Sequence, residues 1–176
     1  MTVALASEAP PFDLPGTDGR NHSLADYADA SWLAVVWSCN HCPYVQAWEG
    51  RMKAIQRDYG SRGFRLVAIN SNDSDSYPED SFEEMQARAE REEFNFDYLH
   101  DEDQSAARAY GPDSTPEVFL FDPDRRLVYH GAIDDSRDEG SVQAQYLRDA
   151  LDALLAGGEP PLAETAPVGC SVKWRK

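Results

Sequence analysis

The sequence has 176 residues with 32 acidic and 16 basic side chains, which give a formal net charge of −16 at neutral pH. This length corresponds to one domain able to bury a core without disulfides, so we expect residues 1–176 to form a single domain. The longest apolar run, Trp32–Trp37, is far shorter than the roughly 20 residues of a membrane-spanning helix. The excess of acidic side chains argues against a phosphate-binding surface. We therefore expect neither a membrane nor a nucleic-acid partner.

The N-terminal ten residues contain no basic side chain and only a short apolar stretch. A secretory signal peptide requires both a basic segment and a longer apolar segment. We therefore expect a cytoplasmic location.

The first half of the chain alternates predicted strands with predicted helices. After a short strand and turn at 12–20, the apolar segment 32–37 has the pattern of a strand buried on both faces. Apolar residues at alternating spacings of three and four then predict a helix that ends at Gly60. A second buried strand follows at 64–69. Ser81, with a glutamate three residues later, forms a capping box that begins the next helix.

The second half combines two short elements, a hairpin and a last helix. These are a strand at 94–98, a helix at 103–110, paired strands at 118–121 and 127–129, and a helix at 142–155. Two parallel β-α-β crossings followed by an antiparallel hairpin define a mixed β-sheet with helices on both faces. The predicted fold class is therefore α/β, with an extra N-terminal strand and turn and a C-terminal tail at 157–176.

The chain has three cysteines, an odd number that does not suit a structural disulfide framework. Cys39 and Cys42 form a C-x-x-C motif between the buried strand and the helix, and Cys170 lies alone in the tail. The N–H groups and positive potential of a helix N-terminus stabilise a thiolate. The two intervening residues, Asn40 and His41, leave room for an intramolecular disulfide. Cys39, as the more exposed N-terminal nucleophile, would then attack a substrate disulfide, and Cys42 would resolve the mixed disulfide.

Two residues next to the cysteines support this interpretation. A protonated His41 beside a thiolate would stabilise the reduced form, although an exposed polar turn residue is the alternative interpretation. Pro43 suits the first position of a helix, where its missing N–H would have been unpaired. Asn40, His41 and Pro43 are therefore the predicted active-site loop.

The position of the motif, together with Thr115-Pro116 just before the strand at 117–121, resembles the thioredoxin fold. The wider chain is similar to a peroxiredoxin-like thioredoxin family within the redoxin group. The segments that carry this similarity are 12–19, 70–73, 77–82 and 169–174. The resemblance implies a thioredoxin-like fold in which a cis-proline loop packs against the cysteine motif. Thr115 and Pro116 would then form the substrate groove.

The resemblance implies a thiol–disulfide oxidoreductase that needs no cofactor and is regenerated by an unidentified reductant. Its substrate would be a disulfide-containing protein, or a small-molecule thiol or peroxide. In peroxiredoxins an arginine assists the peroxidatic cysteine; here Thr115-Pro116 stands where that arginine is expected, and Val35 stands where a proline is expected. Dithiol exchange through Cys39 and Cys42 is thus the leading hypothesis. A peroxidase with Cys42 as the peroxidatic cysteine is the alternative.

The roles of three further groups are less defined by the sequence. The strand at 32–37 lacks the buried carboxylate that thioredoxins use for proton transfer, so Glu117 or His41 is the candidate for that role. Cys170 is either a packed apolar residue or a third redox partner. A zinc-binding or non-catalytic binding module is a minor alternative. Since one C-x-x-C supplies only half of a tetrahedral zinc site, we expect no metal.

Overall fold

The computed structural model describes all of residues 1–176, and its centre is a five-stranded mixed sheet of order β5-β4-β3-β7-β8. The strands are β3 (Trp32–Trp37), β4 (Phe64–Asn70), β5 (Asp97–His100), β7 (Glu117–Phe121) and β8 (Leu127–Gly131). The first three are parallel, whereas β7 runs antiparallel to both β3 and β8. The predicted α/β fold with a mixed central sheet is confirmed.

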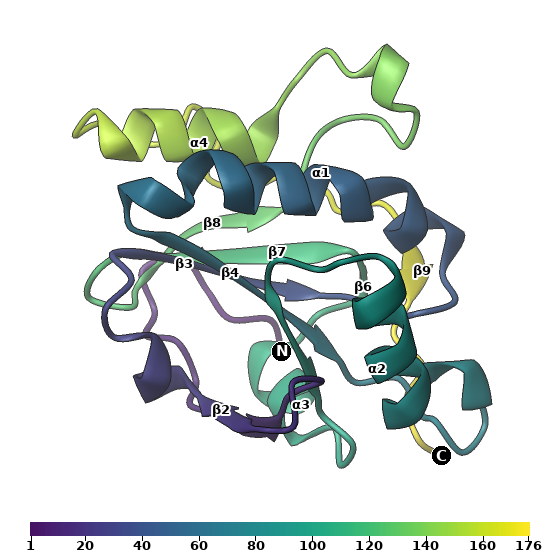
Figure 1. Cartoon of the computed structure of the whole chain (residues 1–176). Coiled ribbons are helices and arrows are strands. Elements are labelled where there is room, and N and C mark those ends of the chain that lie inside the picture. The colour runs from purple at the N-terminus through teal and green to yellow at the C-terminus, as the bar shows by residue number, and fades with distance from the viewer.

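Helices cover both faces of this sheet, with α1 and α4 on one side and α3 on the other (Figure 1). The helices are α1 (Pro43–Tyr59), α2 (Phe82–Arg91), α3 (Ser105–Tyr110) and α4 (Tyr146–Leu155). The N-terminal hairpin of β1 (Asp13–Pro15) and β2 (Asn21–Ser23) lies on the α3 side. None of the helices combines the length and apolar character that crossing a bilayer demands.

Strand β3 shows why the central segment is apolar throughout. Ala34 and Val36 pack into a core of 19 buried residues beneath α1, α2 and α4. Leu33, Val35 and Trp37 point to the opposite face and join a second core of 16 buried residues around α3. Because successive side chains of a strand alternate between faces, a strand covered on both sides must be apolar at every position.

Two predicted boundaries differ from the structure. Strand β5 begins at Asp97, opposite Val67, so the predicted strand at 94–98 is displaced toward the C-terminus. Phe94 and Phe96 alternate because they stack on each other at 4.6 Å against the α2-side core, not because they pair in the sheet. Helix α4 begins at Tyr146 instead of 142, since the preceding backbone bonds to the loop at 135.

The C-terminal tail returns to the sheet edge and forms a small second sheet that the sequence did not predict. Strand β9 (Cys170–Ser171) pairs antiparallel with β6 (Ser114–Thr115), which lies immediately before β7. In Figure 1 the yellow strand β9 lies beside β6 at the end of the sheet where α1 begins. The tail is therefore part of the folded domain, at the edge that carries the cysteine motif.

Candidate active site

The topology of the sheet assembles the site at one edge. Strands β3 and β4 are parallel, so the segments that follow them, 38–42 and 71–73, emerge at the same edge. Strand β7 runs antiparallel to β3 and pairs Glu117 with Trp37, so the start of β7 lies there as well. Sequence segments separated by more than 70 residues thus meet around the cysteine motif.

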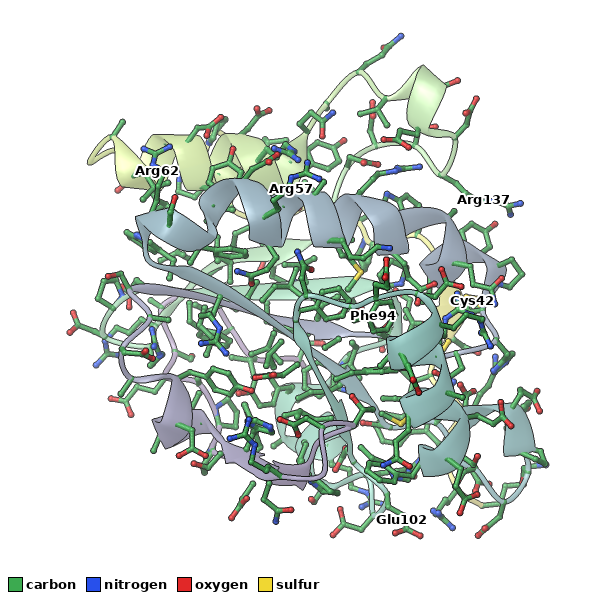
Figure 2. The ribbon with its side chains drawn as sticks, in the orientation of Figure 1. Cys42, Arg57, Arg62, Phe94, Glu102 and Arg137 are labelled. Atoms are coloured by element: carbon green, nitrogen blue, oxygen red, sulfur yellow. A yellow bond between two sulfur atoms is a disulfide. The ribbon has the colours of Figure 1, made fainter.

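Cys42 is the N-cap of α1, and Pro43 occupies the first turn of this 17-residue helix, as predicted. Figure 2 shows Cys42 at the start of α1, next to the ribbon of β9. The unpaired N–H groups and dipole of a helix N-terminus favour negative charge at this position. Cys42 is itself fully buried, so the helix N-terminus is the feature that offsets the cost of ionising its sulfur.

The loop before β7 packs against both cysteines of the motif. The Thr115–Pro116 peptide bond is cis, which confirms the implication of the sequence resemblance. The Thr115 carbonyl oxygen lies 3.8 Å from the Cys42 sulfur, and its hydroxyl lies 3.6 Å from the Cys39 sulfur. Thr115 thus contacts the sulfur atoms of both cysteines.

The disulfide in the structure joins Cys42 to Cys170, and Cys39 is a free thiol. The expected Cys39–Cys42 disulfide is therefore not the one that the structure contains. The Cα atoms of Cys42 and Cys170 are 6.2 Å apart, within the range that a disulfide spans. Pairing of β9 with β6 places Cys170 opposite Thr115, beside the Cys42 sulfur. This tertiary pairing brings together two cysteines separated by 128 positions.

Cys39 is not the exposed nucleophile that the sequence predicts, because both cysteines of the motif are buried. Its side chain is only 1% exposed, beneath the loop and against Thr115. Burial, followed by the negative charge of Asp80, raises the pKa of the Cys39 thiol to about 12. Because the thiolate is the nucleophilic form, Cys39 is held in its unreactive state in this structure.

A fully buried carboxylate, Asp80, anchors the cysteine loop. Asp80 Oδ1 accepts hydrogen bonds from the Asn40 backbone N–H at 2.6 Å and from Asn70 Nδ2 at 3.3 Å. Its Oδ2 accepts one from Asn72 Nδ2 at 3.0 Å. The ring of His41 also contacts Asp80. Asp80 thereby links the loop after β3 to the segment after β4.

Two residues of the predicted active-site loop hold it in position. Asn40 Oδ1 accepts a hydrogen bond from the Tyr98 hydroxyl at 2.8 Å, and Asn40 Nδ2 donates to the Glu79 carbonyl at 2.9 Å. The ring of His41 stacks on Tyr77 with a centroid distance of 5.7 Å. The interpretation of His41 as a simple exposed turn residue is therefore incomplete, because the ring is bound on two sides.

Glu117, a candidate for proton transfer, is engaged elsewhere. Its Oε1 accepts hydrogen bonds from the backbone N–H groups of Asp113 and Ser114, and its Oε2 contacts His130 Nε2 at 2.9 Å. No cysteine is among its hydrogen-bond partners. Glu117 thus orders the loop before the cis-proline, whereas the buried acid near the Cys39 thiol is Asp80.

The sequence reasoning did not identify Asp80 as a site residue. The residue lies within the segment 77–82, which contributed only to the family resemblance. A carboxylate after Pro78 in a polar segment has the pattern of an exposed turn. Only the packing of the segment against the cysteine loop buries it.

Two groups of side chains have the composition of a metal site. Cys39, His41 and Asp80 offer sulfur, nitrogen and oxygen ligand atoms that all lie within 4.8 Å of one another. A structural zinc site takes four ligands, so these three residues alone do not complete one. The second group, Asp18, His22 and Asp97, is more exposed and lies on other elements.

Residues 5–130 match the AhpC/TSA family, and the chain belongs to this family. The chain is 28% identical over 127 residues to the thiol-disulfide oxidoreductase ResA of Geobacillus thermodenitrificans. The aligned region covers 71% of this chain and 67% of that protein.

The fold also resembles solved structures. An uncharacterised conserved protein from Geobacillus kaustophilus superposes with a TM-score of 0.92 at 40% identity, covering 98% of this chain and 93% of its own. The thioredoxin domain of a thiol-disulfide oxidoreductase from Bacteroides vulgatus superposes with a TM-score of 0.63 at 16% identity. This superposition covers 73% of the present chain and 89% of the Bacteroides chain. The fold is therefore thioredoxin-like, and the sequence matches are to the AhpC/TSA family and to a thiol-disulfide oxidoreductase.

Proposed function

We propose that this protein is a thiol–disulfide oxidoreductase in which Cys42 is the sulfur that exchanges disulfides. The observation that carries the proposal is the Cys42–Cys170 disulfide at the N-terminus of α1, beside the cis-proline loop. The position of Cys42 stabilises its thiolate, both as attacking and as leaving group. This assignment differs from the roles first expected, in which Cys39 attacks and Cys42 resolves, because it makes Cys42 the attacking thiol.

The proposed reduction of a substrate proceeds in two exchange steps. The Cys42 thiolate attacks one sulfur of the substrate disulfide, forms a mixed disulfide and releases the other substrate sulfur as a thiolate. The Cys170 thiolate then attacks Cys42, releases the second substrate thiolate and forms the Cys42–Cys170 disulfide seen here. A dithiol reductant returns both cysteines to thiols.

Cys39 is the alternative resolving thiol. It belongs to one small buried cluster with Cys42 and Val45, against which Cys170 also packs. Attack of Cys39 on the mixed disulfide would form the disulfide first expected from the C-x-x-C motif. Single variants at Cys39 and Cys170 distinguish the two resolving thiols.

The test is a redox titration of the wild-type protein and the Cys39→Ser and Cys170→Ser variants. Each is equilibrated in thiol–disulfide buffers, alkylated, and measured by intact mass and peptide mapping. We expect a two-electron step between about −270 and −120 mV that is retained in Cys39→Ser and lost in Cys170→Ser. A step that is lost in Cys39→Ser and retained in Cys170→Ser would instead assign resolution to Cys39.

A thiol peroxidase is the second candidate, because the same disulfide is its product. A peroxide would oxidise Cys42 to a sulfenic acid, which condenses with the Cys170 thiol and releases water. Against this, no guanidinium group is among the hydrogen-bond partners of Cys42 or Thr115. Trapping of a Cys42 sulfenic acid in peroxide-treated Cys170→Ser protein, at a rate exceeding disulfide exchange, would favour the peroxidase.

A further inference from the structure

The C-terminal tail binds the active-site edge in the manner of an added strand. Cys170 pairs with Thr115 and Ser171 pairs with Ser114, and the Val172 N–H donates to the Asp113 carbonyl at 3.2 Å. In Figure 1 this yellow segment continues from β9 along the edge of the molecule to the C-terminus. The tail thus presents a cysteine, in extended backbone, directly to Cys42.

Beyond β9, the tail is held by backbone hydrogen bonds and by the Arg175 side chain, which donates to Asp75 Oδ2 at 2.6 Å and to the Glu102 carbonyl at 3.2 Å. The Lys173 N–H donates to Asn72 Oδ1 at 2.9 Å, and the Lys173 carbonyl accepts from the Asp73 N–H at 2.9 Å. Gln104 Nε2 donates to the same carbonyl at 3.0 Å, and Gln104 Oε1 accepts from the Arg175 N–H at 3.0 Å. Asn72 and Gln104 are buried, so departure of the tail without a replacement would leave their polar atoms to be solvated. Any extended polypeptide supplies the same backbone groups, whereas a small thiol or peroxide does not.

Three side-chain positions of the tail define what such a polypeptide must carry. A Cβ atom at Gly169 would overlap the carbonyl of Thr115, so the position before the cysteine has no room for a side chain. Val172 is only 5% exposed and fills an apolar position two residues after the cysteine. Lys173 Nζ lies 5.9 Å from the centre of the Tyr77 ring, which favours a cation at the next position. The net charge of −16 adds a long-range preference for cationic segments.

We propose that the tail is a built-in occupant of a peptide-binding groove, and that the substrate of this protein is an extended polypeptide with the pattern glycine, cysteine, any residue, apolar residue, basic residue. The tail and the substrate compete for the backbone of β6 and for Cys42. This inference rests on the proposed function, because it names the substrate of the same exchanging sulfur.

The test uses the reduced, full-length Cys170→Ser protein and a peptide with the sequence of residues 167–174. The peptide cysteine is joined in a mixed disulfide to a dye, an aromatic thiol that becomes coloured when it is released. Cys42 attacks the peptide sulfur, the disulfide to the dye breaks, and the dye leaves as a thiolate without net oxidation. The rate of colour release is compared with that of a matched peptide carrying alanine at the glycine position and with that of a small aromatic disulfide.

We expect the glycine peptide to react at least about tenfold faster than the alanine peptide, because a backbone overlap cannot be relieved by side-chain rotation. Adding Gly169→Ala to the Cys170→Ser protein weakens docking of its own tail, so it should accelerate the reaction with the glycine peptide. Gly50→Ala is the matched control, since a Cβ there meets open space on α1.

The outcomes separate this inference from the proposed function. Equal rates for the two peptides, with rapid reaction of the small disulfide, would overturn the peptide groove and leave the proposed function in place. A lack of acceleration in the Gly169→Ala protein, with the protein still folded by circular dichroism, would overturn the competition by the tail. If Cys42 reacts with none of the three disulfides, neither the two peptides nor the small aromatic compound, the proposed function is overturned, and this inference with it.

Discussion

Reduction of the Cys42–Cys170 disulfide is expected to lower the free energy of unfolding by about 5 kcal/mol. The bond joins residues separated by 128 positions, and the loop-closure entropy that a disulfide removes from the unfolded chain grows with the logarithm of that separation. A Cys39–Cys42 disulfide would close a loop of only a few residues and contribute less than about 2 kcal/mol by the same relation. The size of the redox effect on stability therefore identifies which disulfide forms in solution.

The assay is urea unfolding of oxidised and reduced protein, followed by the fluorescence of the four tryptophans. With a urea dependence of about 2 kcal/mol per M, oxidation should raise the midpoint by about 2–3 M. Cys39→Ser retains the long-range disulfide and should show the same difference, whereas Cys170→Ser should lose most of it. A large difference that persists in Cys170→Ser would refute the reasoning, because it would require a long-range disulfide without Cys170.

Three further predictions concern the buried Cys39 thiol. In the oxidised native protein at pH 8, Cys39 should resist alkylation and become labelled only on unfolding, because burial raises the pKa of its thiol to about 12; rapid labelling of native protein would contradict this burial. The thiol ionises at a lower pH in the unfolded chain than in the folded one, so its contribution to stability should be lost as pH rises from 9.0 toward about 12, and this part of a urea–pH profile should be absent in Cys39→Ser. Asp80→Asn should lower the pKa of Cys39, which is measured from the absorbance of the thiolate, because the substitution removes a nearby negative charge. It should also reduce the free energy of unfolding by about 1–3 kcal/mol, because the carboxylate hydrogen bonds are lost. An unchanged Cys39 titration would show that the charge of Asp80 does not affect the thiol.

The elements that could be predicted from the sequence are those whose pattern is local. The apolar run of β3, the stripe of α1 and the Ser81 cap of α2 each reflect the geometry of one element, and all three are found in the structure. Side-chain alternation and helical periodicity hold within a few residues, so one segment suffices to read them. The cis state of Pro116 was implied by family resemblance alone.

The features that the sequence did not predict depend on contacts between distant segments. Asp80 has the local pattern of an exposed turn, yet packing against the cysteine loop buries it completely. The alternating aromatic residues at 94–96 have the pattern of a strand, although they stack outside the sheet. In each case the local pattern fits two environments, and the surrounding fold selects one of them.

The cysteines show the same division most clearly. The sequence by itself determined that a C-x-x-C motif lies between a buried strand and a helix, because the local spacing of apolar residues predicts both elements. It did not determine which two sulfurs pair, since spacing along the chain favours Cys39 and Cys42. The tertiary structure decided for Cys42 and Cys170, because pairing of β9 with β6 brings the tail cysteine to the helix N-terminus while Cys39 is buried beneath the loop.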